Sequence, residues 1–332
     1  MKNKRILILG GTGALGRTLL DRYQDDNQIM IFSRDEHKHV NMQKDKRYHD
    51  DVQYKIGDVK DIDSIRNAIE DYKPNVVINT AALKHVPICE SNTFESVNVN
   101  IVGHRNVINS VKRSNHRIET LIFISTDKAC KPINIYGMCK AISEKLYMDY
   151  ATKQDDIKVC LVRYGNVLES TGSVIPFFKH LIEVGDGDVL PITDFRMTRF
   201  LLSLPQATDL IQWSYDNPNS HGKIAIPKVK SFLISNIAKC LQQHYGKEMK
   251  IKEVGIRPGE KIHEEMISSE EWLRTENHDE NYLITQENEF FQPGQPSTIG
   301  VDAPIEMYSY SSKDDLMDLE ETMKFLKETG VI

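Results

Sequence analysis

A tyrosine and a lysine spaced for proton transfer occur in the middle of the chain, as Tyr136-x-x-x-Lys140. Residues four apart share one face of a helix, so the two side chains would lie together. The Lys140 ammonium would stabilise a phenolate and lower the pKa of Tyr136 towards neutrality. A phenolate can accept the proton of a substrate hydroxyl while hydride leaves the same carbon for a nicotinamide. Such a pair also occurs by chance on helix surfaces, so its meaning depends on its neighbours.

Those neighbours are Ser125-Thr126-Asp127-Lys128, which end an apolar run typical of a buried strand. Thr126 could hydrogen-bond the reacting hydroxyl. Asp127 and Lys128 supply an additional acid and base, which hydride transfer alone does not need but the elimination of water from a neighbouring carbon pair does. The alternative is a hydrated Asp-Lys turn without chemistry, which the position at a strand end disfavours. The predicted catalytic residues are Thr126, Asp127, Lys128, Tyr136 and Lys140.

A glycine-rich turn follows the first predicted strand and opens a helix. Glycines in such a turn let the backbone approach a pyrophosphate, and the helix N-terminus supplies N–H donors and positive potential. The alternative is an ordinary strand-to-helix turn, but the strand before it and the helix after it favour dinucleotide binding. The residues expected to contact the cofactor here are Gly10, Thr12, Gly13, Ala14, Leu15 and Gly16.

The end of the second predicted strand distinguishes NADP from NAD. A carboxylate there would accept the ribose 2′-hydroxyl of NAD, whereas this chain has Ser33-Arg34, and Arg34 can bind a 2′-phosphate. We therefore expect NADP. NAD stays open because Asp35 and Glu36 follow at once, and a solvated charged turn is the plain alternative. Further predicted cofactor contacts in this region are Ser33, Arg34, Asp35 and Lys38, with Asp58 and Val59 beside the adenine ring.

Short β-branched runs alternate with helix-length segments through the first half, which predicts right-handed βαβ crossovers and a doubly wound α/β fold with a parallel sheet, the Rossmann fold. After about Gly165 this rhythm breaks. We expect a cofactor domain over 1–165, to which some later segments return, and a smaller substrate-binding lobe with a C-terminal tail over 166–332. The last 20 residues predict an amphipathic surface helix. Predicted strands are 5–9, 28–32, 53–56, 76–79, 121–125 and 159–163.

Composition excludes several classes of protein. A formal charge of −6 without a basic stripe argues against nucleic-acid binding. Five scattered cysteines without CxxC spacing predict reduced thiols rather than disulfides or a zinc site, and we expect no metal. The N-terminal apolar run is too short for a signal peptide, and no run of roughly 18 apolar residues could span a membrane. These features predict a cytoplasmic protein.

Several segments together resemble the inverting UDP-N-acetylglucosamine 4,6-dehydratases, which are extended short-chain dehydrogenases of polysaccharide biosynthesis. The resemblance runs from residue 6 to about 267, whereas 276–332 matches weakly and receives no functional residue. Met138 and Cys139 depart from the Ala and Thr expected between Gly137 and Lys140, a change that affects packing. The segments that carry the resemblance are 125–129, 132–137, Lys140, 81–87, 163–167, 172–178, 191–194, 196–200 and 257–261.

The resemblance implies a reaction in which Tyr136 helps oxidise the sugar at carbon 4 and the ketone acidifies the hydrogen at carbon 5. Lys128 would remove that hydrogen, and a protonated Asp127 would give its proton to the departing 6-hydroxyl. Hydride then returns from NADPH to carbon 6, and carbon 5 is reprotonated from the opposite face. The product would be UDP-2-acetamido-2,6-dideoxy-β-L-arabino-hex-4-ulose, so the enzyme would be a lyase that ends with its NADP unchanged.

The resemblance also implies further contacts and an assembly. Arg199 and Arg257 would bind the diphosphate, since guanidinium groups match phosphate oxygens, and Glu260 would bind a ribose or uracil edge. Relatives suggest a homo-oligomer, a dimer or a hexamer. The other implied cofactor contacts are Ala81, Ala82, Lys84, Ser125, Tyr136, Lys140 and Val167. The other implied substrate contacts are Lys84, Asn166, Ile175, Thr193 and Met197.

Other functions stay open at this point. A dehydratase that retains configuration at carbon 5 and a UDP-sugar 4-epimerase would share the cofactor turn. A non-catalytic NADP-binding regulator is the alternative from a different class, and it predicts lost catalytic groups, whereas all five are present here. No residue identifies the acetamide, so N-acetylglucosamine rather than glucose rests on the resemblance.

Overall fold

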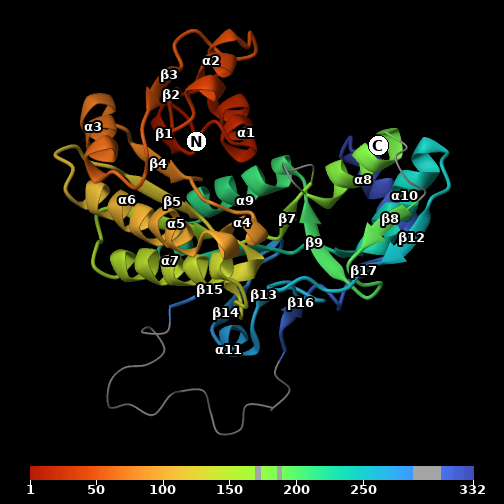
Figure 1. Cartoon of the computed structure of the whole chain (residues 1–332). Coiled ribbons are helices and arrows are strands. Elements are labelled where there is room, and N and C mark those ends of the chain that lie inside the picture. The colour runs from red at the N-terminus through yellow and green to blue at the C-terminus, as the bar shows by residue number, and fades with distance from the viewer. Residues whose placement is uncertain (169–172, 185–188, 287–307) are drawn as a thin grey trace, which may run out of the picture.

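A nine-stranded sheet forms the centre of the structure, a computed structural model that describes residues 1–168, 173–184, 189–286 and 308–332 (Figure 1). The strand order is β14-β15-β10-β6-β5-β4-β1-β2-β3. Neighbouring strands pair in parallel from β3 to β10, and the β10–β15 and β15–β14 pairings are antiparallel. The strands are β1 (Arg5–Leu9), β2 (Gln28–Ser33), β3 (Gln53–Ile56), β4 (Val76–Asn79), β5 (Thr120–Ile124), β6 (Lys158–Val162), β10 (Ile224–Pro227), β14 (Thr275–Asn277) and β15 (Asn281–Ile284).

This order confirms the predicted doubly wound fold. From β1 the chain adds strands first on one side of the sheet, to β3, and then on the other side, from β4 onwards. In such sheets ligands bind beyond the carboxyl ends of the strands, in the crevice between the two strands where the direction changes, here β1 and β4. β10, β14 and β15 come from the second half of the chain. The division at residues 165 and 166 stays a prediction, but the sheet itself continues beyond it.

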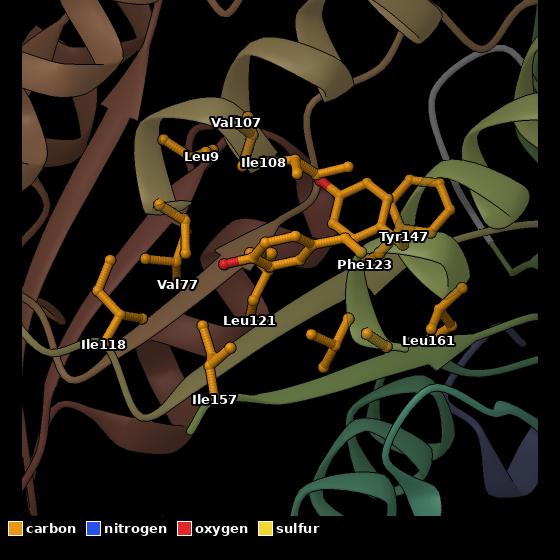
Figure 2. Packing of buried hydrophobic residues seen from close by; sticks show 14 of the residues in the cluster. Leu9, Val77, Val107, Ile108, Ile118, Leu121, Phe123, Tyr147, Ile157 and Leu161 are labelled. Carbon is orange, nitrogen blue, oxygen red and sulfur yellow. The ribbon is translucent and has the colours of Figure 1, made fainter. Parts of the chain in front are cut away.

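Helices cover both faces of the sheet, and the alternation of side chains along β1 separates two cores. Leu7 and Leu9 belong to the core under α3, α6 and α7, whereas Ile6 and Ile8 belong to the core under α1 and α9. In the first core the ring of Phe123 stacks on that of Tyr147 at 4.4 Å (Figure 2). The helices are α1 (Ala14–Tyr23), α2 (Glu36–Lys44), α3 (Ile62–Tyr72), α6 (Gly103–Lys112), α7 (Ile135–Ala151) and α9 (Leu204–Asp216).

Short helices fill the connection from β4 to α6 and the turn after β5. They are α4 (Val86–Ser91), α5 (Thr93–Val97), the π-helical η1 (Asn98–Val102) and the 3-10 helix η2 (Asp127–Ala129). Another 3-10 helix, η3 (Pro218–Ser220), precedes β10. α7 packs against η2, so the turn after β5 lies directly beside the longest helix of the first half.

The second half of the chain builds a smaller lobe with its own apolar core, which includes Ile175, Phe178 and Phe232. The predicted C-terminal helix is confirmed as α13, in which Leu326 is fully buried. Small sheets join β17-β11-β9-β7, β12-β8 and β13-β16. The elements are β7 (Asn166–Val167), α8 (Val174–Val184), β8 (Val189–Ile192), β9 (Thr198–Leu202), β11 (Ser231–Leu233), α10 (Ile234–Tyr245), β12 (Lys250–Glu253), β13 (Glu265–Ile267), α11 (Ser269–Trp272), β16 (Tyr310–Ser311), β17 (Leu316–Met317) and α13 (Leu319–Glu328).

All five cysteines are buried and free, as their spacing predicted. Within the described ranges, no helix has both the length and the apolar character needed to cross a bilayer.

Candidate active site

The glycine-rich turn has the shape of a dinucleotide cradle. Gly10 adopts φ +78°, and a Cβ there would lie 2.7 Å from the Ala81 backbone, so only glycine fits between β1 and the segment after β4. Gly13 is the exposed N-cap of α1 and provides no side-chain cap. The first N–H groups of α1 are therefore free of a capping side chain and can bind a phosphate. Ala14 and Leu15 open this helix, and Gly16 is buried in its first turn.

Hydroxyls and a histidine connect the turn to the end of β2. The Thr12 and Ser33 hydroxyl oxygens are 2.9 Å apart, and Ser33 Oγ lies 2.9 Å from His39 Nε2. Asp35 caps α2, because its carboxylate accepts the backbone N–H of Lys38 at 3.0 Å. Asp35, one of the two acids expected to compete with Arg34 for the ribose, is thus engaged by the helix that it caps; the other is Glu36.

Arg34 extends from the end of β2 into a group of opposite charges. Its Nη1 lies 3.8 Å from Asp58 Oδ2 and 3.9 Å from Glu95 Oε1, and its side chain is 55% exposed. The structure therefore places Arg34 beside Asp58, a contact that the sequence did not predict. Val59 is buried in the core beneath α6, so only its backbone could contact a ligand.

The five predicted catalytic residues come from η2 and the first turns of α7. Asn134 caps α7 by accepting the Gly137 N–H at 2.8 Å. A Cβ on Gly137 would overlap the backbone carbonyl oxygen of Lys128, so glycine lets the helix lie directly against the turn. This contact places Tyr136, one residue earlier, near the Thr126 and Asp127 side chains.

Asp127 and Lys128 form a hydrogen-bonded pair, in which the Lys128 side chain stays 18% exposed. Lys128 Nζ donates to Asp127 Oδ1 and to Asn166 Oδ1, both at 3.0 Å, and Thr126 Oγ1 donates to the same Asp127 oxygen at 2.9 Å. Asp127 is fully buried. Burial alone would lower the pKa of Lys128, but the carboxylates of Asp127 and Glu264 outweigh it and raise that pKa above the ordinary value.

The predicted effect of Lys140 on Tyr136 is wrong for this structure. Burial, followed by the charges of Asp127 and Cys89, raises the pKa of Tyr136 above its ordinary value. Lys140 instead donates to the backbone oxygen of Ile124 at 2.8 Å, and burial lowers its own pKa to about 7. In an enclosed site both groups favour their neutral forms, because desolvation disfavours each charged form.

The remaining predicted cofactor contacts lie in or just after strands of two different sheets. Ala81 and Ala82 follow β4, and Val167 lies in β7. Lys84 is exposed after β4. The Ser125 hydroxyl, however, donates to Glu144 Oε1 at 2.5 Å inside the protein.

The predicted substrate residues other than Lys84 divide into three groups. Asn166 contacts Lys128 and Arg199 lies near it, whereas the Ile175 and Met197 side chains are buried in the core of the second lobe. Burial of those two side chains leaves only their backbones for a ligand. Outside the core lie the half-buried Thr193, the exposed Arg257 and the partly exposed Glu260, whose Oε1 is 3.9 Å from Arg257 Nη1.

Sequence reasoning missed the groups behind the site. Glu264 is buried 3.6 Å from Lys128 Nζ. Arg163 is almost fully buried between Glu144 and Glu271, at 2.6 and 2.8 Å. Glu264 has an acidic neighbour, Glu265, and no periodicity in that segment indicates which of the two points inward.

The family described as "Polysaccharide biosynthesis protein" matches residues 6–286. The chain belongs to that family. Among its relatives, a Campylobacter jejuni protein (serotype O:23/36, strain 81-176) named UDP-N-acetylglucosamine 4,6-dehydratase (inverting) is 40% identical over 86% of each chain. A Rickettsia akari protein named UDP-glucose 4-epimerase is 36% identical over 98% of this chain and 95% of its own.

Among solved structures, Pen from Bacillus thuringiensis has the same architecture as this polysaccharide biosynthesis protein, with a TM-score of 0.86 and 28% identity. The match covers 100% of this chain and 99% of Pen. A relative of this similarity therefore contains both lobes, and not the cofactor domain alone.

Proposed function

We propose that this protein is a UDP-N-acetylglucosamine 4,6-dehydratase that inverts carbon 5. One observation carries the proposal: the fully buried Asp127 carboxylate is hydrogen-bonded at 3.0 Å to the Lys128 ammonium, whose side chain is 18% exposed. Hydride transfer at carbon 4 requires neither group, whereas elimination requires an acid and a base together. The inverting Campylobacter relative supports the substrate and the stereochemistry.

In the proposed reaction, Thr126 orients the 4-hydroxyl and Tyr136, in its phenolate form, takes the hydroxyl proton. The positive charge of a bound oxidised nicotinamide would favour that phenolate over the neutral phenol that burial favours. When bound, NADP would accept hydride from carbon 4 and return it to carbon 6. Lys128 then takes the proton from carbon 5, and the electron pair of that C–H bond forms the carbon 5–carbon 6 double bond. The 6-hydroxyl leaves with the proton of Asp127 as water. After hydride has returned to carbon 6, carbon 5 takes a solvent-derived proton on the face opposite Lys128.

This acid–base assignment needs one internal proton transfer. A charged Lys128 with an ionised Asp127 contains the same number of protons as a neutral Lys128 with a protonated Asp127. The two forms differ by the movement of one proton across the 3.0 Å hydrogen bond between the side chains. The pair therefore reaches its reactive form without exchange with solvent.

We propose NADP as the cofactor, because Arg34 stands at the end of β2 and Asp35 is engaged as the cap of α2. The uncapped N-terminus of α1 fits a pyrophosphate. For the substrate, Arg199, Arg257 and Glu260 are proposed to bind the UDP moiety, in keeping with the guanidinium geometry that phosphate favours.

We further propose that the protein works in the cytoplasm as a homo-oligomer, a dimer or a hexamer. Large apolar side chains are exposed on two neighbouring helices, Phe94 on α5 at 88% and Met138 and Ile142 on α7 at 44% and 47%. A second copy would remove that apolar surface from water.

The deciding experiment incubates the protein with NADP and UDP-N-acetylglucosamine in deuterated water and follows the product by NMR. We expect loss of one water, a new 6-methyl signal, deuterium at carbon 5 and inverted geometry there. A 4-hydroxy epimer without a 6-methyl signal would instead support the 4-epimerase, the activity in the name of the Rickettsia relative. Retained geometry at carbon 5 would identify a retaining dehydratase.

A catalytic-site variant separates the enzyme from a non-catalytic NADP-binding regulator. Lys128→Ala should lose dehydration while wild type turns over. Equal turnover in both proteins would remove Lys128 from the mechanism, and no turnover in either, with UDP-glucose tested as well, would favour the regulator.

A further inference from the structure

A second buried carboxylate, that of Glu264, lies beside the Lys128 ammonium. Glu264 is 3% exposed, and its Oε1 is 3.6 Å from Lys128 Nζ. Arg199 Nε lies 3.9 Å from the same oxygen, and Lys261 Nζ lies 3.9 Å from Glu264 Oε2. Three cations therefore surround one carboxylate that water hardly reaches.

The backbone of Glu264 is fixed by the C-terminal part of the chain. Its N–H donates to Ser312 Oγ at 2.9 Å, and the Ser312 N–H donates to the Glu264 carbonyl oxygen at 2.8 Å. Yet Glu264 Oε2 has no hydrogen-bond partner among the described residues. A buried carboxylate with an unbonded oxygen costs stability, so stability alone does not explain this residue.

We propose that Glu264 is a positioning residue for the general base Lys128, which orients the amine and stabilises the ammonium that forms when Lys128 takes the carbon 5 proton. The inference rests on the proposed function. A carboxylate behind a catalytic base has the same role in the Ser-His-Asp triad, where it orients the base and stabilises the cation that forms. Glu264 itself gains and loses no proton.

The charges around Lys128 give this role a measurable signature. Asp127 gives up its proton in the same step, so both carboxylates are ionised when the ammonium is complete. Removal of the Glu264 charge would lower the pKa of Lys128, because an anion within about 4 Å favours the protonated amine. Removal of the Lys261 charge would have the opposite effect. The charged groups that face the Lys128–Glu264 pair are Asp127, Arg199 and Lys261, and the titratable Tyr136 lies beside Asp127.

The test compares Glu264→Gln with wild type by the pH dependence of kcat/KM and by the isotope effect with substrate deuterated at carbon 5. We expect kcat to fall on the order of 100-fold, with a smaller change in KM. The basic limb of the profile should move down by about one pH unit, since loss of a proton from Lys128 inactivates the pair. The isotope effect should rise because proton removal becomes slower than the other steps.

Two further variants keep the test decisive. Glu265→Gln is the matched control, because the neighbouring Glu265 pairs with Lys131 at 3.1 Å instead of Lys128, and its profile should equal that of wild type. Lys261→Met should move the basic limb up, and it tests the same electrostatics if Glu264→Gln does not fold. An unmoved limb in every folded variant would overturn the inference while wild-type dehydration leaves the proposed function intact. Absence of dehydration in wild type would overturn the proposed function instead.

Discussion

Arg34 is the side chain whose charge would distinguish NADP from NAD in the proposed cofactor site. Arg34→Ala should weaken NADP binding about 10- to 100-fold, the effect of one lost charge-assisted hydrogen-bonded contact. Binding of NAD, which has no 2′-phosphate, should change by less than about threefold. Isothermal titration with both nucleotides measures the difference. Lys44→Ala, which removes a positive charge at the C-terminal end of α2, serves as the control. Equal losses for both nucleotides would contradict a 2′-phosphate site.

For single residues, the sequence predicted which side chains lie together when they share a strand end or a helix turn. It missed side chains that come to the site from far along the chain. Thr126, Asp127 and Lys128 lie together because one turn holds them. Glu264 joins them only through tertiary packing, so local spacing contains no signal for it. The predicted pKa shift of Tyr136 was wrong because the degree of burial also depends on the rest of the fold.

The contact between α7 and η2 sets the distance between the tyrosine and the acid–base pair. Gly137→Ala would push a methyl group into the Lys128 carbonyl and displace one element from the other. We expect turnover to fall about 100-fold, the cost of a shift near 1 Å, with a loss of stability of about 1–3 kcal/mol. Met138→Ala, on the exposed side of the same helix turn, should keep near-wild-type turnover. The assay is NMR-detected dehydration beside thermal unfolding, and full activity in Gly137→Ala would contradict the close contact.

The sequence predicted β1 to β6 of the parallel sheet, and all of these except β3 are largely apolar runs, whereas β10 was not predicted. β1, β3 and β4 have the predicted bounds, β2 ends one residue later, and β5 and β6 begin and end one residue earlier than predicted. The second lobe was not resolved into elements from the sequence. Its strands are short, such as Asn166–Val167 in β7, and their pairing is defined by partners far along the chain.

The two halves of the molecule are joined by ion pairs around one buried arginine. Arg163 follows β6, and its guanidinium donates to Glu144 on α7, to Glu271 on α11 and to the Met266 backbone oxygen of β13. Removal of one member would leave an uncompensated buried charge. The cofactor sheet and the later segments should therefore unfold as one cooperative unit.

The pH dependence of stability tests this connection across the whole molecule. Burial alone would raise the pKa of Glu271, but the charge and hydrogen bonds of Arg163 outweigh burial and lower it to about 2. An acid with a folded-state pKa below its unfolded value stabilises the protein above about pH 4.5 and loses that contribution as pH falls towards 2. Wild type should therefore unfold at a higher temperature than Glu271→Gln at pH 7, and the difference should shrink as the pH falls below 4.5. Thermal unfolding of both proteins from pH 7 to 3.5 measures it, and a constant difference over that range would show that Glu271 does not carry this charge-dependent stability.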